Sequence, residues 1–196
     1  MPKDIIGETA MTANKKRVCP VEYAGVLDFS LRKLIQNPRK ILRPYISEGM
    51  TVLDIGCGPG FFTMEMAKIV GISGKVIAAD LQEGMLRKLE DKIRNTEFQN
   101  IIQLHQCQEN KIGLAEKVDF VLVFWMLHEV PDQLRFLKEI STLLKPDAKI
   151  MIVEPPFHVS KKEFANLIES VRKLGFAIID RPKVFFSHSM VIKIAI

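Results

Sequence analysis

The sequence predicts an α/β fold built on a doubly wound, mostly parallel sheet of seven strands. Three observations lead to this class. Apolar runs of strand length alternate with longer segments of helical period from residue 51 onward. A glycine-rich run, "GCGPG", follows the first of these strands at residues 56–60. The last two strand-like runs are joined by a link too short for a parallel crossover, so the final strand is expected to be antiparallel.

The first five strands are expected at 51–55, 75–80, 101–105, 118–127 and 149–154. The fourth run is nearly all apolar, which is typical of a strand covered on both faces. Segments that begin at Phe61, Glu83 and Pro131 carry apolar residues at helical spacing and are expected to be the connecting helices. With helices on both faces, the result is a Rossmann-like sheet with right-handed crossovers.

The two ends of the chain differ from this regular middle part. A helix over 161–176 is followed by strand-like runs at 176–182 and 189–196, which are expected to pair as antiparallel neighbours at the edge of the sheet. Residues 1–45 are expected to form a helical cap or lid segment, with a break at a proline. Residues 46–196 form the ligand-binding domain, and the whole chain is a single domain.

Composition narrows the functional classes. No apolar stretch is long enough to span a membrane and the N-terminus lacks the apolar middle of a signal peptide, so the cytoplasm is the expected compartment. Three scattered cysteines predict neither a disulfide framework nor a metal site. The net charge is +5, with basic flanks and an acidic centre. Because no basic stripe with stacking aromatics is present, nucleic acid is disfavoured as a partner.

The glycine loop, residues 56–60, lies where open parallel sheets bind ligands, beyond the carboxyl end of the first strand. Its glycines allow positive φ angles and close approach to a ligand, although such loops also occur in turns that bind nothing. The spacing G-x-G-x-G departs from the dinucleotide pattern G-x-G-x-x-G and argues against NAD. Asp54 places a carboxylate near the ligand, which favours a cationic group over a pyrophosphate.

Asp80 ends the second strand at the same edge of the sheet. A carboxylate there can accept hydrogen bonds from both hydroxyls of a ribose. The alternative is an acidic residue that only stabilises the N-terminus of the next helix. With the glycine loop, Asp80 predicts a ligand that has a ribose, a positive group and no bridging phosphates.

Four motifs in order extend this prediction. They are "GMTVLDIGCGPGFF", "KVIAADLQEGML", "VDFVLVFWMLHEVPD" and "LLKPDAKIMIVEP". With these motifs, roughly residues 35–160 resemble the class I S-adenosylmethionine-dependent methyltransferases, and in particular the small ones similar to ubiquinone and menaquinone biosynthesis methyltransferases. The resemblance implies S-adenosylmethionine as the cofactor.

By that resemblance, Asp54, Gly56 and Gly58 surround the methionine part, Asp80 binds the ribose and Leu81 lies beside the adenine. The residue after the third strand is often an acid or an amide in the family, and here that place is taken by Cys107. The predicted cofactor site is completed by Cys57, Gly60, Gln108 and Phe124.

Residues after the fourth and fifth strands are candidates for the acceptor side. His128 and Glu129 are the predicted catalytic pair, because a base is needed only if the acceptor must lose a proton. The alternative for His128 is simple packing against the pocket wall. The predicted acceptor site contains Tyr23, Trp125, His128, Glu154 and His158, although Trp125 also suits a core role.

The sequence therefore predicts an enzyme that transfers a methyl group to a small-molecule acceptor by in-line displacement. Two other readings stay open, a non-catalytic module that binds S-adenosylmethionine and an RNA methyltransferase. The absence of a Pro-Pro-Tyr motif after the fourth strand argues against the RNA reading. Self-association as a homodimer also stays open.

Overall fold

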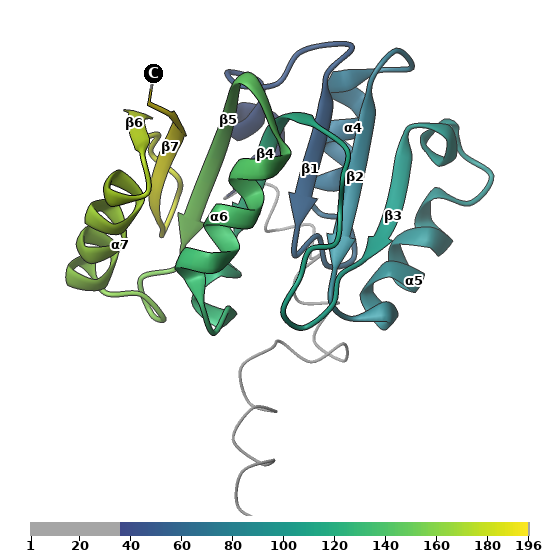
Figure 1. The fold of residues 1–196 in the computed structure, drawn as a ribbon. Helices are drawn as coiled ribbons and strands as arrows, with labels where there is room; N and C mark the ends of the chain where they lie inside the picture. The colour runs from purple at the N-terminus through teal and green to yellow at the C-terminus, as the bar shows by residue number, and fades with distance from the viewer. Residues whose placement is uncertain (1–35, 196) are drawn as a thin grey trace, which may run out of the picture.

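The computed structural model describes residues 36–195, which form one sheet with helices on both faces (Figure 1). The strands are β1 (Thr51–Ile55), β2 (Lys75–Asp80), β3 (Ile102–Gln106), β4 (Val118–Phe124), β5 (Leu144–Glu154), β6 (Phe176–Asp180) and β7 (His188–Ile194). Their order across the sheet is β3-β2-β1-β4-β5-β7-β6. β7 runs antiparallel to β5 and β6, and the other neighbours are parallel. The predicted fold class is confirmed.

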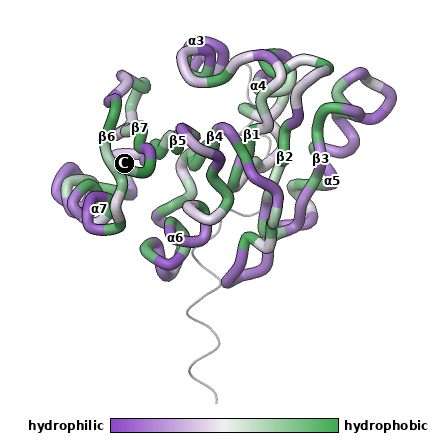
Figure 2. Tube along the Cα trace, turned by 45° about the horizontal axis from the view of Figure 1, so that its top comes forward, coloured by the Kyte–Doolittle hydropathy of each residue, from purple (hydrophilic) through white to green (hydrophobic). Residues whose placement is uncertain are grey.

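The helices divide between the two faces of the sheet, each with its own apolar core. The helices are α3 (Pro38–Leu42), α4 (Thr63–Val70), α5 (Glu83–Ile93), α6 (Gln133–Leu143) and α7 (Lys161–Lys173), with short 3-10 turns η2 (Glu97–Asn100) and η3 (Leu127–Glu129). α3, α4 and α5 pack on one face and α6 and α7 on the other. Figure 2 shows hydrophobic residues along the central strands and mixed colours along α6 and α7, as expected of helices that bury one side.

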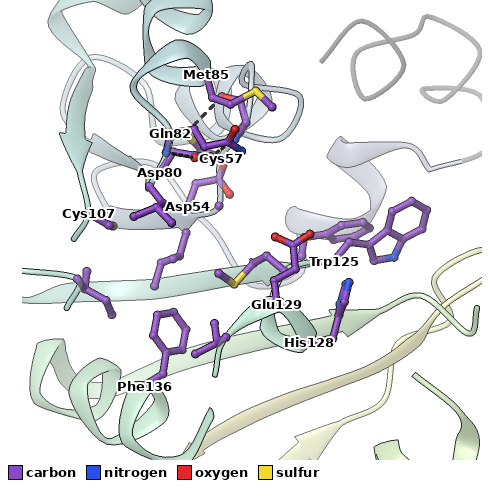
Figure 3. Close-up of a pocket in the computed structure, with 18 of the residues that line it drawn as sticks. Asp54, Cys57, Asp80, Gln82, Met85, Cys107, Trp125, His128, Glu129 and Phe136 are labelled. Atoms are coloured by element: carbon purple, nitrogen blue, oxygen red, sulfur yellow. Dashed lines mark hydrogen bonds between the residues drawn. The ribbon is translucent and has the colours of Figure 1, made fainter. Parts of the chain in front are cut away.

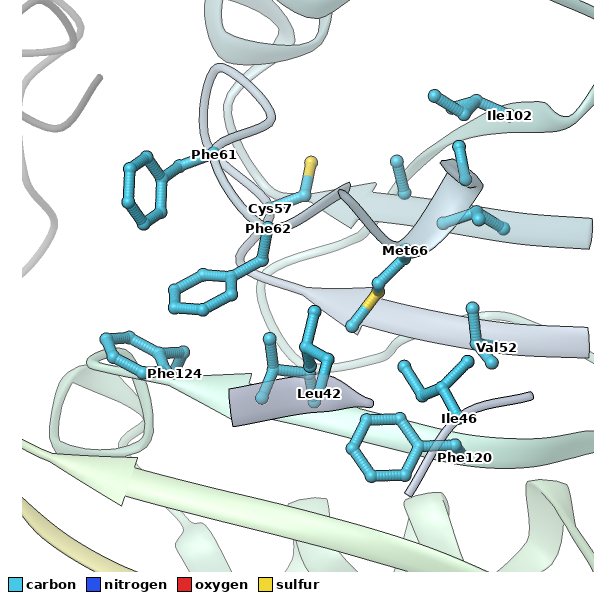
Figure 4. Packing of buried hydrophobic residues seen from close by; sticks show 14 of the residues in the cluster. Leu42, Ile46, Val52, Cys57, Phe61, Phe62, Met66, Ile102, Phe120 and Phe124 are labelled. Carbon is cyan, nitrogen blue, oxygen red and sulfur yellow. The ribbon is translucent and has the colours of Figure 1, made fainter. Parts of the chain in front are cut away.

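Side chains of β4 point alternately to the two faces of the sheet and so contribute to both apolar cores. Phe120, Leu122 and Phe124 belong to the core beneath α4, which Figure 4 shows, whereas Val121 and Val123 belong to the core beneath α6. All five side chains are nearly or fully buried. A strand that buries both faces suits the middle of the sheet, as the apolar run predicted.

Several boundaries differ from the sequence prediction, and three of these differences concern the segments around β4, α6 and β5. β4 ends at Phe124, earlier than predicted, because Trp125 takes a φ of 56° that interrupts a strand. α6 begins at Gln133, because the Asp132 side chain accepts from the amide of Arg135 and so caps the helix. β5 begins already at Leu144, through an irregular pairing with the start of β4.

The predicted break at Pro38 is instead the start of a helix. Asn37 caps α3 by accepting from the Lys40 amide, and Pro38 occupies the first turn, where its missing amide hydrogen costs nothing. Leu42 and Ile46 then pack into the core beneath α4. The remainder of the predicted cap segment, with Tyr23, lies outside the described residues. None of the helices within residues 36–195 is long and apolar enough to cross a membrane.

Candidate active site

A cavity of about 440 Å³ lies at the carboxyl edge of the parallel strands, within the range of small-molecule sites. Figure 3 shows that it has two ends. The glycine-loop end is defined here by Asp54, Gly56, Cys57, Gly58, Asp80, Leu81, Cys107 and Gln108. The histidine end is defined by Trp125, His128, Glu129, Phe157 and His158. The parallel strand arrangement explains this convergence, because the segments that follow all these strands leave at one edge.

The glycines of the loop have different roles. Gly58, at φ 53°, lines the cavity, and a Cβ there would meet no atom of the described residues within 4 Å, so a ligand can approach its backbone. At Gly56, at φ 70°, a Cβ would lie 2.8 Å from Met126 Cγ. Gly60 does not line the cavity, and a Cβ there would lie 2.5 Å from Leu89 Cδ1 on α5. Gly60 therefore permits close packing of the loop on α5, and the predicted ligand contact of Gly60 is not part of this geometry.

Asp80 is fixed at the centre of the glycine-loop end. Its two carboxylate oxygens accept from the backbone amides of Gly58 and Gln82, each at 2.9 Å. Burial raises the pKa of Asp80 above its usual value, and the backbone amides of Gln82, Gly58 and Leu81 oppose that rise. Each oxygen keeps further acceptor capacity for a ligand. The amide contact to Gln82, the residue before α5, agrees with the alternative prediction of an acidic residue that stabilises a helix start, and the ribose contact stays a prediction.

Asp54 and the two cysteines complete this end. Asp54 is 2% exposed and accepts a hydrogen bond of 2.6 Å from the hydroxyl of Thr63, at the start of α4. Burial, with the nearby charges of Asp54 and Asp80, raises the pKa of the Cys57 thiol well above its usual range. Burial and the charges of Asp80 and Glu139 raise the pKa of Cys107 to about 12. Both thiols are therefore protonated at neutral pH and are poor nucleophiles.

Aromatic rings form much of the histidine end. Trp125 donates its indole N–H to Ser187 Oγ at 3.0 Å, and its ring meets Phe157 edge-on, with centroids 5.8 Å apart. Phe157 is 60% exposed and stacks on Phe186, which is equally exposed. Trp125 is therefore a wall of the cavity and is held in place by the segment between β6 and β7.

A buried carboxylate fixes the ring of His128. Its Nδ1 lies 2.5 Å from Oε2 of Glu154, which is 1% exposed at the end of β5. On its open side, the ring stacks on His158 with centroids 4.8 Å apart and planes inclined by 15°. Burial lowers the pKa of His128, but the hydrogen bond to Glu154 and the charges of Glu154 and Glu129 outweigh it, so the pKa is raised.

Most of the predicted site residues meet at this cavity. The predicted residues that line it are Asp54, Gly56, Cys57, Gly58, Asp80, Leu81, Cys107, Gln108, Phe124, Trp125, His128, Glu129 and His158. Glu154 does not line the cavity, because it lies beneath His128 with both oxygens bonded within the chain. The predicted contact of Glu154 with an acceptor is therefore not part of this geometry. Tyr23 lies outside the described residues.

Sequence reasoning missed several lining residues, among them Gln82, Met85, Met126, Arg135, Phe136 and Phe157. Met85 is one of the apolar residues of the helix predicted to begin at Glu83, and it belongs both to the core and to the lining of the cavity. Phe157 directly follows "EPP" on the carboxyl edge, and this position was its one available signal. Phe136 lies on α6, where helical spacing carries no mark of a cavity.

Comparisons with known proteins agree with this geometry. A family model described as "Methyltransferase domain" matches residues 46–180. The chain is 34% identical over 151 residues to a demethylmenaquinone methyltransferase of Lactobacillus johnsonii, a match that covers 74% of this chain and 62% of that protein. It is 27% identical over 137 residues to a ubiquinone/menaquinone biosynthesis C-methyltransferase of Cronobacter sakazakii, covering 69% of this chain and 53% of that protein. The chain thus spans less than two thirds of the length of these curated relatives.

Solved structures share the fold. The crystal structure of a SAM dependent methyltransferase from Aquifex aeolicus superposes with a TM-score of 0.80 at 28% identity, covering 89% of this chain and 98% of that chain. A SAM-dependent O-methyltransferase from Thermotoga maritima superposes with a TM-score of 0.65 at 18% identity, covering 82% of this chain and 65% of that chain. The second likeness shows the fold alone.

Proposed function

This chain belongs to the methyltransferase domain family, and from that premise we propose that it transfers a methyl group from S-adenosylmethionine to a small organic acceptor. The observation that carries the proposal is the Asp80 carboxylate, which the amides of Gly58 and Gln82 hold at the cavity edge. The predicted resemblance to class I S-adenosylmethionine-dependent methyltransferases agrees with the family match and with the solved relative from Aquifex aeolicus.

The residues at the glycine-loop end fit this cofactor. The open space beside Gly58 allows a ligand to reach the backbone, and the free acceptor capacity of Asp80 suits two ribose hydroxyls. Asp54 supplies a carboxylate for a cationic group, and Leu81 and Cys107 offer apolar surface for a base. When bound, S-adenosylmethionine supplies a methyl group that is already activated on a positively charged sulfur.

The chain's own task is then to hold the acceptor in line and to exclude water. We assign the acceptor to the histidine end, where Trp125 and Phe157 offer ring faces and edges for an aromatic molecule. His128 is the candidate base, because its Nδ1 is bonded to Glu154 and Nε2 is the nitrogen left for an acceptor. The names of the curated relatives make quinone-type acceptors the first class to test.

Methyl transfer can be tested directly. The protein is incubated with methyl-labelled S-adenosylmethionine and a panel of reduced quinones, and both label transfer and S-adenosylhomocysteine are measured. We expect labelled quinol. Cofactor binding without turnover over a broad panel would favour a non-catalytic binding module. Label in RNA, with salt-sensitive RNA affinity, would favour an RNA methyltransferase instead.

We further propose that residues 1–45 cap the histidine end, whereas residues 46–196 hold the cofactor. Gln36, which belongs to this segment and is the first described residue, donates its side-chain amide to the carbonyl of Phe185 at 3.3 Å, and so contacts the loop that carries the exposed rings of Phe185 and Phe186. Tyr23→Ala should therefore raise the acceptor KM without changing cofactor affinity. An unchanged KM contradicts the cap. If a homodimer covers these rings instead, Phe186→Ser will lower the mass measured in solution.

The two described cysteines support a proposal for the compartment. Neither Cys57 nor Cys107 forms a disulfide. Free thiols of this kind are typical of a reducing environment, so we propose that the protein acts in the cytoplasm.

A further inference from the structure

Beside the cavity, Glu154 makes a set of buried contacts that the proposed function does not yet explain. This carboxylate is 1% exposed, at the carboxyl end of β5 and between β4 and β7. Its Oε1 accepts from the backbone amide of Leu127 at 2.9 Å, and its Oε2 lies 2.5 Å from Nδ1 of His128. A buried carboxylate is costly unless it is hydrogen-bonded, and both oxygens are. The buried carboxylate thus fixes the two residues that begin η3.

The contact with Glu154 assigns the hydrogen of the neutral His128 ring to Nδ1. An ionised carboxylate can only accept, so Nδ1 must be the donor in a bond of this length. In the neutral ring, Nε2 is then the acceptor. The side chain of His128 is 17% exposed, so it is sheltered by the site but open to it.

The other charged and titratable groups around His128 are few among the described residues. Glu129 adds a second negative charge nearby. His158 stacks against the ring, and stacking fixes its plane without bonding either nitrogen. His188 is the register partner of Glu154 on β7, and its buried Nε2 has no hydrogen-bond partner among the described residues. Glu154 is thus the one of these groups that is hydrogen-bonded to His128.

We propose that Glu154 is a positioning residue that holds His128 as the Nδ1–H tautomer, so that Nε2 takes the proton of the methyl acceptor. This inference rests on the proposed function and deepens it, because it replaces the predicted pair His128 and Glu129 by His128 and Glu154. It also selects acceptors that must lose a proton, such as a phenol or a quinol hydroxyl, over acceptors that react without losing one.

The chemical balance is simple. The acceptor's nucleophilic atom forms a bond to the methyl carbon while the bond between that carbon and sulfur breaks. The electron pair of the broken carbon–sulfur bond stays on sulfur. The acceptor's proton moves to Nε2 of His128. The resulting imidazolium lies against the Glu154 carboxylate, which stabilises it in a site sheltered from water. The proton later leaves from Nε2 to solvent.

The decisive experiment reads the histidine itself. Nitrogen-15 NMR of the full chain, without cofactor, reports the tautomer of His128 and its titration. In the wild type we expect the Nδ1–H form above the pKa, and a pKa above that of an ordinary histidine. Glu154→Gln should move the titration to lower pH and populate the Nε2–H form. Glu129→Gln is the matched control: it also removes one carboxylate, and the tautomer should not change.

Kinetics provide a second measurement. Glu154→Gln should lower kcat about 100-fold with little change in the acceptor KM, and the acidic limb of the pH profile should move to lower pH. An Nε2–H tautomer in the wild type, or an unchanged tautomer and pH profile in Glu154→Gln, overturns the inference. The wild-type spectrum decides even if that variant fails to fold. Absence of methyl transfer with the expected tautomer counts against the proposed function and leaves the pairing intact.

Discussion

At the glycine-loop end of the cavity, backbone amides hold the Asp80 carboxylate, whereas at the histidine end side chains hold His128 and Trp125. The amides of Gly58 and Gln82 meet Asp80 directly. By contrast, His128 depends on Glu154, and Trp125 depends on Ser187, each from a distant part of the chain. The contacts of Asp80 therefore join the ends of two neighbouring strands, whereas those of the histidine end join three segments that lie far apart in the chain.

This difference suggests separate tasks. A backbone site requires glycines with positive φ at fixed spacing, so it allows little variation and suits a cofactor that is always the same. Side chains on loops can be exchanged without altering the sheet, which suits an acceptor that varies. If the tasks are separate, changes at one end should move cofactor affinity and changes at the other should move acceptor kinetics. The predictions below test this separation, from the largest expected effect to the smallest.

The largest effect is expected from Asp80→Ala. Loss of two hydrogen bonds to a charged group, at roughly 1.5–3 kcal/mol each, should weaken S-adenosylmethionine binding by about 100-fold or more. Isothermal titration calorimetry measures this, and thermal unfolding verifies that the variant is folded. Asp80→Asn keeps the shape and one acceptor oxygen, so it should lose less. Unchanged affinity in the alanine variant would contradict the ribose assignment.

A second change separates two glycines of the same loop. Gly58→Ala should weaken cofactor binding at least tenfold, because its Cβ points into the cavity, and should cost about 1–2 kcal/mol of stability for a left-handed alanine. Gly60→Ala carries the same strain plus the overlap with Leu89, so its unfolding free energy should fall by about 2–5 kcal/mol. Denaturant unfolding and calorimetry, run on both variants, distinguish the two roles. Equal losses of stability would refute them.

The pH dependence of cofactor binding should follow Asp80. Since burial raises the pKa of Asp80, its protonated form appears at a higher pH than for an exposed aspartate. Protonation removes the charge that favours hydrogen bonds from ribose hydroxyls, so affinity should fall as the pH decreases through that raised pKa. Calorimetry between neutral and mildly acidic pH measures the fall. A wild-type curve as flat as that of Asp80→Asn would count against the role of the charge.

The glycine-loop end was predictable because its chemistry is local in sequence. Asp54 and Asp80 lie at the carboxyl ends of two strands recognisable by their apolar runs, and Gly58 follows the first of them. Their meeting at one edge follows from the parallel arrangement. Gly60 shows the limit of that reasoning. Its spacing suggested a ligand contact, whereas its neighbour is Leu89 on α5. Spacing alone does not distinguish a glycine that faces a ligand from one whose missing Cβ allows a helix to pack closely.

The histidine end was less predictable because its contacts join residues far apart in the chain. Glu154 was predicted to touch the acceptor, but its burial beneath His128 depends on how β5 lies against β4. The predicted pair of His128 and Glu129 were neighbours in sequence, and the partner in space was Glu154. Similarly, the short link predicted that the last two strands pair at the edge of the sheet. It did not indicate that β6 is the edge strand and that β7 lies between β5 and β6.

The smallest effect is expected at Trp125. Trp125→Phe keeps an aromatic wall but loses the bond from the indole N–H to Ser187, so stability should fall by about 1 kcal/mol and the acceptor KM should rise a few-fold. Ser187→Ala removes the same bond and leaves the ring, so it should reproduce the stability loss with a smaller rise in KM. Steady-state kinetics at saturating cofactor measure both. Cofactor affinity should stay unchanged in each variant, because neither residue belongs to the glycine-loop end. If affinity falls in step with the rise in KM, the two ends act as one site and their proposed separation is wrong.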